Sequence, residues 1–246
     1  MIKIKSYAAE TNSGPYLNIN EDGYLIDLAN KLFVIFDGFG GSGIGDKVVE
    51  VLKGDIAHFY TKFGGDPDST MPFYFSHKYL LEGNALINSL RFSHKNLLKK
   101  NSNIAPNQRG GASAIAMSFS ENICTLAGTG NCKAYLIRKG RLKCLVDDDS
   151  IRWVVGDDYH KENLTCPMSG FGLFEDLHLK VTEVKPVQDD VLLFLTDGTY
   201  ARLEEEELLY FALKSDLTPS ERIGKLFSLA NERGNHDNQS GLLMQF

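Results

Sequence analysis

The sequence has few cysteines, no long apolar run and no excess of positive charge. Its four cysteines, Cys124, Cys132, Cys144 and Cys166, show no Cys-x-x-Cys spacing, so reduced and mostly buried thiols are expected rather than disulfides or a zinc site. No stretch approaches the roughly 18 apolar residues that a membrane-spanning helix needs, and the first residues lack the apolar core of a signal peptide. We therefore expect a cytoplasmic protein without a membrane partner.

The charge balance argues against a nucleic-acid partner. The 246 residues include 26 Lys and Arg against 32 Asp and Glu, a formal charge of −6, whereas a general nucleic-acid binder carries a basic surface. The only locally basic run lies within 91–109 and contains Arg91, His94, Lys95, Lys99, Lys100 and Arg109. A solvent-exposed helix face is its simplest interpretation, and a site for an acidic or phosphorylated partner is the alternative.

The absence of repeats, low-complexity tracts and Pro/Ser-rich linkers predicts one domain over 1–246. Apolar, β-branched and aromatic runs predict strands at 23–26, 31–36, 112–119, 123–128, 132–138, 179–184 and 191–196. Helical patterns run from 45 to about 60, from about 76 to 100, from about 203 to 215 and from 220 to 232. Polar and glycine-containing turns at 120–122 and 139–140 favour antiparallel hairpins. Helices grouped between sets of strands indicate an α+β fold.

A glycine-rich segment follows the strand expected at 31–36. Gly38-x-Gly40-x-x-Gly43 formally matches the dinucleotide-binding fingerprint. That fold requires a second strand ending in an acidic residue about 20 positions later, and the sequence after Asp55 offers none. Residues 45–48 also break the Gly-Lys-Ser/Thr order of a phosphate-binding loop. A nucleotide-binding oxidoreductase is therefore disfavoured.

Carboxylates recur at the ends of the predicted segments. Asp37-Gly38 and Asp197-Gly198 each end an apolar strand, and Glu21, Asp22 and Asp237 lie at other segment ends. Any one of them can be an ordinary turn residue. Several together suit hard divalent cations such as Mg²⁺ or Mn²⁺, which prefer oxygen ligands, and such ions can catalyse phosphoryl transfer.

Six short segments then occur in a definite order along the whole chain: 20–22 (Asn-Glu-Asp), 34–41 (Val-Ile-Phe-Asp-Gly-Phe-Gly-Gly), 111–113 (Gly-Ala-Ser), 130–135 (Gly-Asn-Cys-Lys-Ala-Tyr), 193–198 (Leu-Phe-Leu-Thr-Asp-Gly) and 237–240 (Asp-Asn-Gln-Ser). In these motifs the sequence resembles the metal-dependent serine/threonine protein phosphatases of type 2C, the PPM family, in their short bacterial form. The resemblance implies a four-layer α-β-β-α sandwich of two antiparallel sheets flanked by helices.

The resemblance also implies a site with two Mg²⁺ or Mn²⁺ ions per chain. Asp37 would bridge both ions, Asp197 and Asp237 would complete the first, and Glu21 and the Gly38 carbonyl would hold the second. Asp22 would orient metal-bound water. A metal-bridging hydroxide would then hydrolyse phosphoserine or phosphothreonine in a protein substrate, opposing a Ser/Thr kinase, and the enzyme would act as a monomer.

Three positions depart from the family's pattern. Leu17 stands where an arginine commonly grips the substrate phosphate, and Arg109, Lys133 or Arg152 could substitute for it from another loop. Asn131 stands where an aspartate usually contacts a third, weaker ion, so weak or absent third-ion binding is expected. Phe39 stands where some relatives have a histidine that would protonate the leaving group.

These departures leave a second hypothesis open, a pseudophosphatase or phosphoprotein-binding regulatory module with little turnover. The segment 156–172 lies where the family has a variable flap, so substrate contacts are expected there. His236, next to Asp237, could act as a proton shuttle, although pairing with a neighbouring group is the simpler role. The run Glu204-Glu205-Glu206-Glu207 is expected to begin an exposed helix, where acidic residues suit the positive end of the dipole.

Overall fold

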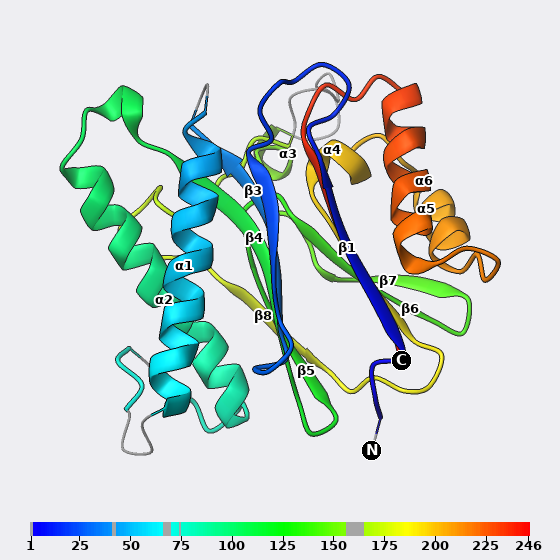
Figure 1. Ribbon diagram of the computed structural model, residues 1–246, viewed down its shortest axis with the longest axis horizontal. Coiled ribbons are helices and arrows are strands. Elements are labelled where there is room, and N and C mark those ends of the chain that lie inside the picture. Colours follow the sequence, from blue (N-terminus) through cyan, green and yellow to red (C-terminus); the bar gives the residue numbers. More distant parts are fainter. Residues whose placement is uncertain (1, 41–42, 66–69, 74, 156–164) are drawn as a thin grey trace.

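Two five-stranded sheets pack face to face in a computed structural model that describes residues 2–40, 43–65, 70–73, 75–155 and 165–246 (Figure 1). All neighbouring strands are antiparallel. One sheet has the order β2 (Asp22–Asp27), β3 (Leu32–Phe39), β4 (Gly111–Ser120), β5 (Ile123–Thr129) and β8 (Lys180–Val184). The other has the order β1 (Ser6–Asn12), β10 (Gln239–Gln245), β9 (Val191–Leu195), β6 (Lys133–Arg138) and β7 (Arg141–Val146).

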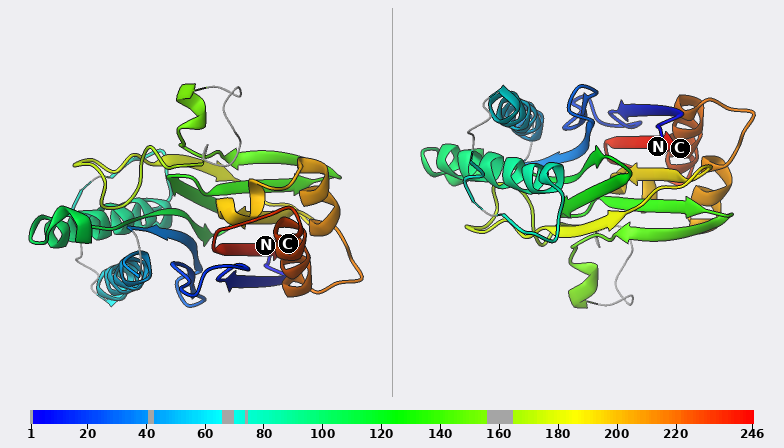
Figure 2. Two further views of the ribbon diagram at one scale, coloured as in Figure 1. Left: turned by 90° about the horizontal axis from the view of Figure 1, so that it is seen from above. Right: turned by 90° about the horizontal axis from the view of Figure 1, so that it is seen from below.

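Helices cover the outer face of each sheet. The helices α1 (Gly45–Gly65) and α2 (Leu81–Ser102) lie on the β3 sheet, and α5 (Glu205–Ala212) and α6 (Pro219–Glu232) lie on the other (Figure 2). Shorter pieces are η1 (Pro106–Gln108), α3 (Arg152–Val155) and α4 (Asp197–Tyr200). The predicted α+β sandwich of four layers is confirmed. Within the described residues, no helix is both long enough and apolar enough to cross a bilayer.

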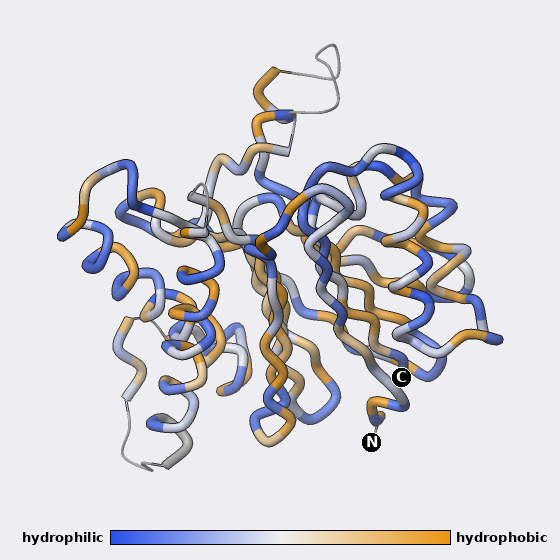
Figure 3. Tube along the Cα trace, turned by 45° about the horizontal axis from the view of Figure 1, so that its top comes forward, coloured by the Kyte–Doolittle hydropathy of each residue, from blue (hydrophilic) through white to orange (hydrophobic). Residues whose placement is uncertain are grey.

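Three hydrophobic cores hold the four layers together. In β3, Phe36 faces the core under α1 and α2, whereas its neighbour Ile35 faces the core between the sheets. In β9, Phe194 lies in the central core and Leu193 in the core under α5 and α6. Alternate side chains of a strand point to opposite faces, so a strand with helices on one side and a sheet on the other is apolar throughout. The hydrophobic central strands are visible in Figure 3.

The strands that the sequence predicts are all present, with ends shifted by at most a few residues. The hairpin turns are also present, since Lys139 and Gly140 both have positive φ values, 52° and 70°. Three further strands, β1, β7 and β10, were not predicted. The first two are polar edge strands, and such sequences lack a strong apolar alternation. The expected helix from about 76 begins instead at Leu81.

The basic run on α2 is not wholly a solvent-exposed face, since Arg91 is half-buried. Lys95, Lys99 and Lys100 are exposed, but His94 is buried. Its Nε2 lies 2.9 Å from the Phe174 carbonyl oxygen, and the Gly172 N–H donates to its Nδ1 at 3.2 Å. Burial lowers the pKa of His94, which favours this neutral, two-sided hydrogen bonding. His94 therefore anchors the segment after 165 to α2.

Candidate metal centre

The predicted acidic residues lie at one end of the sandwich because their strands end there. Asp22 opens β2 and lies directly opposite Asp37 of β3. Asp197 lies two residues after the end of β9, and Asp237 lies two residues before the start of β10, the neighbour of β9. Glu21 immediately precedes β2. Strand register thus brings together residues that are up to 216 positions apart in the chain (237 − 21).

Side-chain hydrogen bonds fix the two sheets to each other at this end. Asn238 accepts from the Glu21 N–H at 2.8 Å and donates to the Ile19 carbonyl at 3.1 Å. The Thr196 hydroxyl donates to Asp22 Oδ2 at 2.9 Å and accepts from the Ser240 N–H at 2.8 Å. The predicted segments 20–22, 193–198 and 237–240 are therefore one connected structure.

The glycines of the two Asp-Gly pairs permit close backbone approach. A Cβ atom on Gly38 would lie 2.4 Å from the Glu21 carbonyl oxygen, and one on Gly198 would lie 1.9 Å from the Asn238 carbonyl oxygen. Neither glycine has a positive φ. Glycine is needed here because neighbouring backbone segments occupy the space of a side chain.

Gly198→Ala is expected to destabilise the protein by roughly 2–4 kcal/mol, since the methyl group would overlap backbone that cannot move without breaking the Asn238 contacts. The matched control is Gly224→Ala in α6, where a Cβ would have open space. Alanine there should raise stability by about 0.5–1 kcal/mol, because glycine is unfavourable inside a helix. Urea unfolding followed by circular dichroism measures both, and equal effects of the two substitutions would contradict this account.

A hollow of about 520 Å³ gathers every residue that the sequence predicts as a metal ligand. Its lining includes Glu21, Asp37, Gly38, Asp197 and Asp237. Phe39, Asn131 and the residues Thr165, Cys166 and Pro167 complete much of the wall. Asp22 is not in this lining and lies buried behind it. A smaller adjoining hollow of about 160 Å³ includes Asp197, Asp237, Arg202 and His236.

Burial and mutual repulsion raise the pKa values of the aspartates in the site. Burial, followed by the charges of Asp197, Asp22 and Asp237, raises the pKa of Asp37 well above its usual range. Burial is also the main reason that the pKa of Asp22 is raised. The pKa of Asp197 is raised to about 6, first by burial and then by Asp237. The site accumulates negative charge for which it has little compensation of its own.

The chemistry of these donors fits Mg²⁺ or Mn²⁺, which favour carboxylate and carbonyl oxygens. As the side chains lie, however, no group of three or more His, Cys, Asp or Glu residues in the described part of the chain is arranged to hold an ion. Protein donors occupy their oxygens instead: Gly43 N–H donates to Glu21 (2.7 Å), Asn131 Nδ2 to Asp197 (2.9 Å) and Asn238 N–H to Asp237 (2.8 Å). Side-chain rotation would be needed to bring the carboxylates onto one ion.

Asn131 is built into the centre of the site. Its Nδ2 donates to Asp197 Oδ2, its backbone carbonyl accepts from the Tyr200 hydroxyl at 2.5 Å, and its N–H donates to the Ser113 hydroxyl at 3.2 Å. Its Oδ1 is buried and has no hydrogen-bond partner among the described residues. The Asn131 amide thus donates a hydrogen bond to Asp197. An aspartate at position 131 would instead add a further negative charge beside it.

The basic residues that could replace the arginine missing at position 17 lie in different places. Leu17 and Arg109 are exposed, and the Arg109 Nε donates to the Ile104 carbonyl. Lys133 and Arg152 line a different hollow beside the carboxylates. Arg202 was not predicted, and only its position five residues after Asp197 could have drawn attention to it.

The structure tests the predictions for His236 and for the segment 156–172 only in part. His236 stacks on the Tyr16 ring, with centroids 4.9 Å apart, so it has a partner outside the carboxylate cluster. Of the segment 156–172, residues 156–164 lie outside the described part of the chain. Its continuation, 165–167, lines the main hollow, and Cys166 is exposed there while Cys124 and Cys132 are buried.

Several solved structures share this architecture at low sequence identity. PppA, described as a key regulatory component of the type VI secretion system in Pseudomonas aeruginosa, is 21% identical with a TM-score of 0.79, and the match covers 98% of both chains. The PPM Ser-Thr phosphatase MsPP from Mycobacterium smegmatis, solved with cacodylate, is 19% identical over 100% of both chains (TM-score 0.78). The catalytic domain of the serine/threonine phosphatase PstP, solved with two manganese ions, is 19% identical over 98% of this chain and 97% of its own (TM-score 0.76).

No family model and no curated protein matches the sequence. The chain therefore has the fold of the PPM Ser/Thr phosphatases.

Proposed function

We propose that this chain, as a single domain over 1–246, is a Mg²⁺- or Mn²⁺-dependent phosphatase of phosphoserine and phosphothreonine in proteins, opposing a Ser/Thr kinase. One observation carries the proposal. In a fold shared with PPM phosphatases, Glu21, Asp37, Gly38, Asp197 and Asp237 line a single hollow. The raised pKa values of the aspartates among them support a cation as the occupant.

The residues divide into two groups in this proposal. Asp37, Asp197 and Asp237 would hold one ion, and Asp37, Glu21 and the Gly38 carbonyl would hold the other. Bound divalent ions supply charge stabilisation for a phosphoryl group and lower the pKa of water. Asp22, whose Oδ2 accepts from Thr196, would orient a metal-bound water molecule from behind the ion ligands.

Hydrolysis of p-nitrophenyl phosphate and of a phosphothreonine peptide tests the proposal. We expect turnover that requires added Mn²⁺ or Mg²⁺ and that disappears with a chelator. A wild-type rate no higher than that of Asp197→Ala under the same conditions would reject it.

A phosphoprotein-binding regulatory module is the second candidate. Leu17 and Asn131 favour it, because neither supplies the charge expected at those positions, and PppA is described as a regulatory component. This function predicts binding of the phosphothreonine peptide without release of phosphate. Metal-dependent turnover of the same peptide would exclude it.

Asn131→Asp is expected to have opposite effects on the metal-free and the metal-loaded protein. Without metal, a carboxylate would replace the donor that lies 2.9 Å from Asp197 Oδ2, lowering stability by roughly 1–3 kcal/mol. With millimolar Mn²⁺, the variant should bind one more ion than wild type. Chemical denaturation measures the first effect and titration calorimetry the second. A third ion bound beside Asn131 in the wild-type protein would contradict this prediction.

A further inference from the structure

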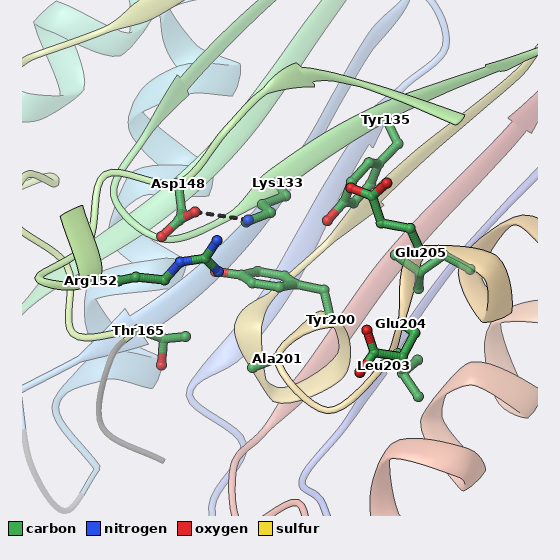
Figure 4. A pocket seen from close by; sticks show the side chains of 11 residues that line it. Lys133, Tyr135, Asp148, Arg152, Thr165, Tyr200, Ala201, Leu203, Glu204 and Glu205 are labelled. Carbon is green, nitrogen blue, oxygen red and sulfur yellow. Dashed lines mark ion pairs between the residues drawn. The ribbon is translucent and has the colours of Figure 1, made fainter. Parts of the chain in front are cut away.

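Figure 4 shows the residues that line a second hollow, of about 540 Å³. Shared lining residues place it beside the carboxylate hollow. Thr165 lines both of them. Ala201 is shared with the smaller hollow that contains Asp197 and Asp237. A molecule bound at the carboxylates could therefore extend into this second hollow, to which the proposed chemistry gives no role.

The hollow has aromatic and aliphatic walls. Tyr135 of β6 and Tyr200 of α4 contribute their rings, and Leu203 and Leu208 add apolar surface. Tyr200 is fixed by its hydrogen bond to the Asn131 carbonyl, and both tyrosines are largely buried. Such walls suit the aliphatic stem of a long side chain.

One end of the hollow is basic, but its lysine is already neutralised. Lys133 Nζ lies 2.9 Å from an oxygen of Asp147 and 2.9 Å from one of Asp148, and 4.8 Å from the centroid of the Tyr200 ring. Arg152 of α3 reaches the same end (Figure 4). The two cations are thus opposed by two carboxylates, which leaves little attraction for an anionic occupant.

The other end of the hollow is acidic. Glu204 and Glu205, at the start of α5, line it, and the Glu205 side chain extends toward Tyr135 in Figure 4. Among the described residues, no hydrogen bond or ion pair is made by the exposed Glu205 carboxylate. The charge of the whole lining, with Lys133 and Arg152 against Asp148, Glu204 and Glu205, is negative by one.

We infer that this hollow binds a lysine or arginine side chain of the phosphorylated substrate, with its aliphatic stem against Tyr135 and Tyr200 and its cation at Glu205. The inference rests on the proposed phosphatase function and adds a sequence preference to it. A carboxylate beside aromatic faces is a favourable setting for a cation. Because an extended chain advances about 3.3 Å per residue, the basic residue would lie within a few positions of the phosphorylated one.

A set of phosphothreonine peptides tests this inference. Each peptide carries a single Lys, Ala or Glu at one of the four positions on either side of the phosphothreonine, and kcat and KM are measured with Mn²⁺. At one position, Lys should raise kcat/KM over Ala by roughly three- to tenfold, mainly through KM, and Glu should lower it. The preference should weaken with added salt.

Substitutions at neighbouring positions of α5 provide the control. Glu205→Gln should abolish the preference for Lys, and Glu205→Lys should reverse it in favour of Glu. Glu206→Gln removes the same charge from the same helical turn, but Glu206 does not line the hollow, so the preference should persist. Hydrolysis of p-nitrophenyl phosphate, which has no flanking residues, should be unchanged in all three variants.

Three results would overturn the inference. They are equal kcat/KM for Lys and Ala at every position, a preference for Glu in the wild-type protein, or equal effects of Glu205→Gln and Glu206→Gln. Each of these requires that the wild-type protein hydrolyses the peptides. Failure to hydrolyse both the peptides and p-nitrophenyl phosphate would instead overturn the proposed function. The inferred binding site for a basic side chain would then fall with it.

Discussion

Asp37→Asn is expected to lower Mn²⁺-dependent hydrolysis of a phosphothreonine peptide by roughly a thousandfold or more. Asp37 is the one carboxylate assigned to both ions, and the charges of Asp22, Asp197 and Asp237 all act on it. Asparagine keeps the shape but removes the charge that offsets a cation. Because the substitution also relieves repulsion within the cluster, the metal-free variant should remain folded and be at least as stable as wild type.

Asp189→Asn is a matched control for the loss of one aspartate charge. Asp189 is exposed at the opposite end of β9 from Asp197, and its positive φ of 67° suits asparagine. The activity of the Asp189→Asn variant should equal that of the wild-type protein. The assay is phosphate release at saturating Mn²⁺, with calorimetric Mn²⁺ binding as a second readout. Retention of full activity and full Mn²⁺ binding by Asp37→Asn would show that the site is assigned wrongly.

Stability of the metal-free protein is expected to fall as the pH rises through the range in which the buried aspartates ionise. The pKa of Asp197 rises from an ordinary 3.8 to about 6 on folding, and those of Asp22 and Asp37 also rise. A raised folded-state pKa stabilises the protein below the unfolded-state value and loses this contribution as pH passes the folded-state value. For Asp197 the loss between about pH 4 and pH 6.5 is on the order of 3 kcal/mol.

Asp197→Asn isolates this effect from the titration of other carboxylates. The variant cannot ionise at position 197. As the pH rises, the unfolding free energy of the wild-type protein should therefore fall relative to that of the variant. Saturating Mn²⁺ should stabilise wild type more at pH 7.5 than at pH 5, because the cation and protons compete for the same oxygens. Chelator-treated protein and urea unfolding at several pH values provide the measurement. Parallel pH profiles for wild type and Asp197→Asn would contradict the prediction.

Among the central strands, β3 and β9 could be predicted because they face a core on both sides. The segments 32–36 and 191–195 are apolar at every position for that reason. The central strand β10 was missed because its apolar run is short, only Leu242, Leu243 and Met244. β1 and β7 were missed because edge strands can carry polar residues such as Glu10 or Lys143 without cost. His94 was misplaced because its buried role depends on backbone groups of Gly172 and Phe174, about 80 positions away.

The candidate site was predictable as a set of residues but not as an arrangement. The Asp-Gly pairs and the acidic segment ends identify the residues that line the hollow. Their orientation depends on distant donors, such as Asn131 for Asp197, and no local sequence pattern encodes such contacts. The second hollow likewise combines residues of β6, α3, α4 and α5, so its acidic and basic ends could not be recognised from the sequence.

The most direct test of the account is a Mn²⁺ titration of the metal-stripped protein during which phosphate release from a phosphothreonine peptide is followed. The account predicts no release without the ion, binding of two equivalents of Mn²⁺ by calorimetry, and activity that rises as they bind. The Asp197→Ala protein should remain inactive throughout. Phosphate release that is the same without added cation, or the same in wild type and Asp197→Ala, would contradict the central claim that these carboxylates form a catalytic metal site.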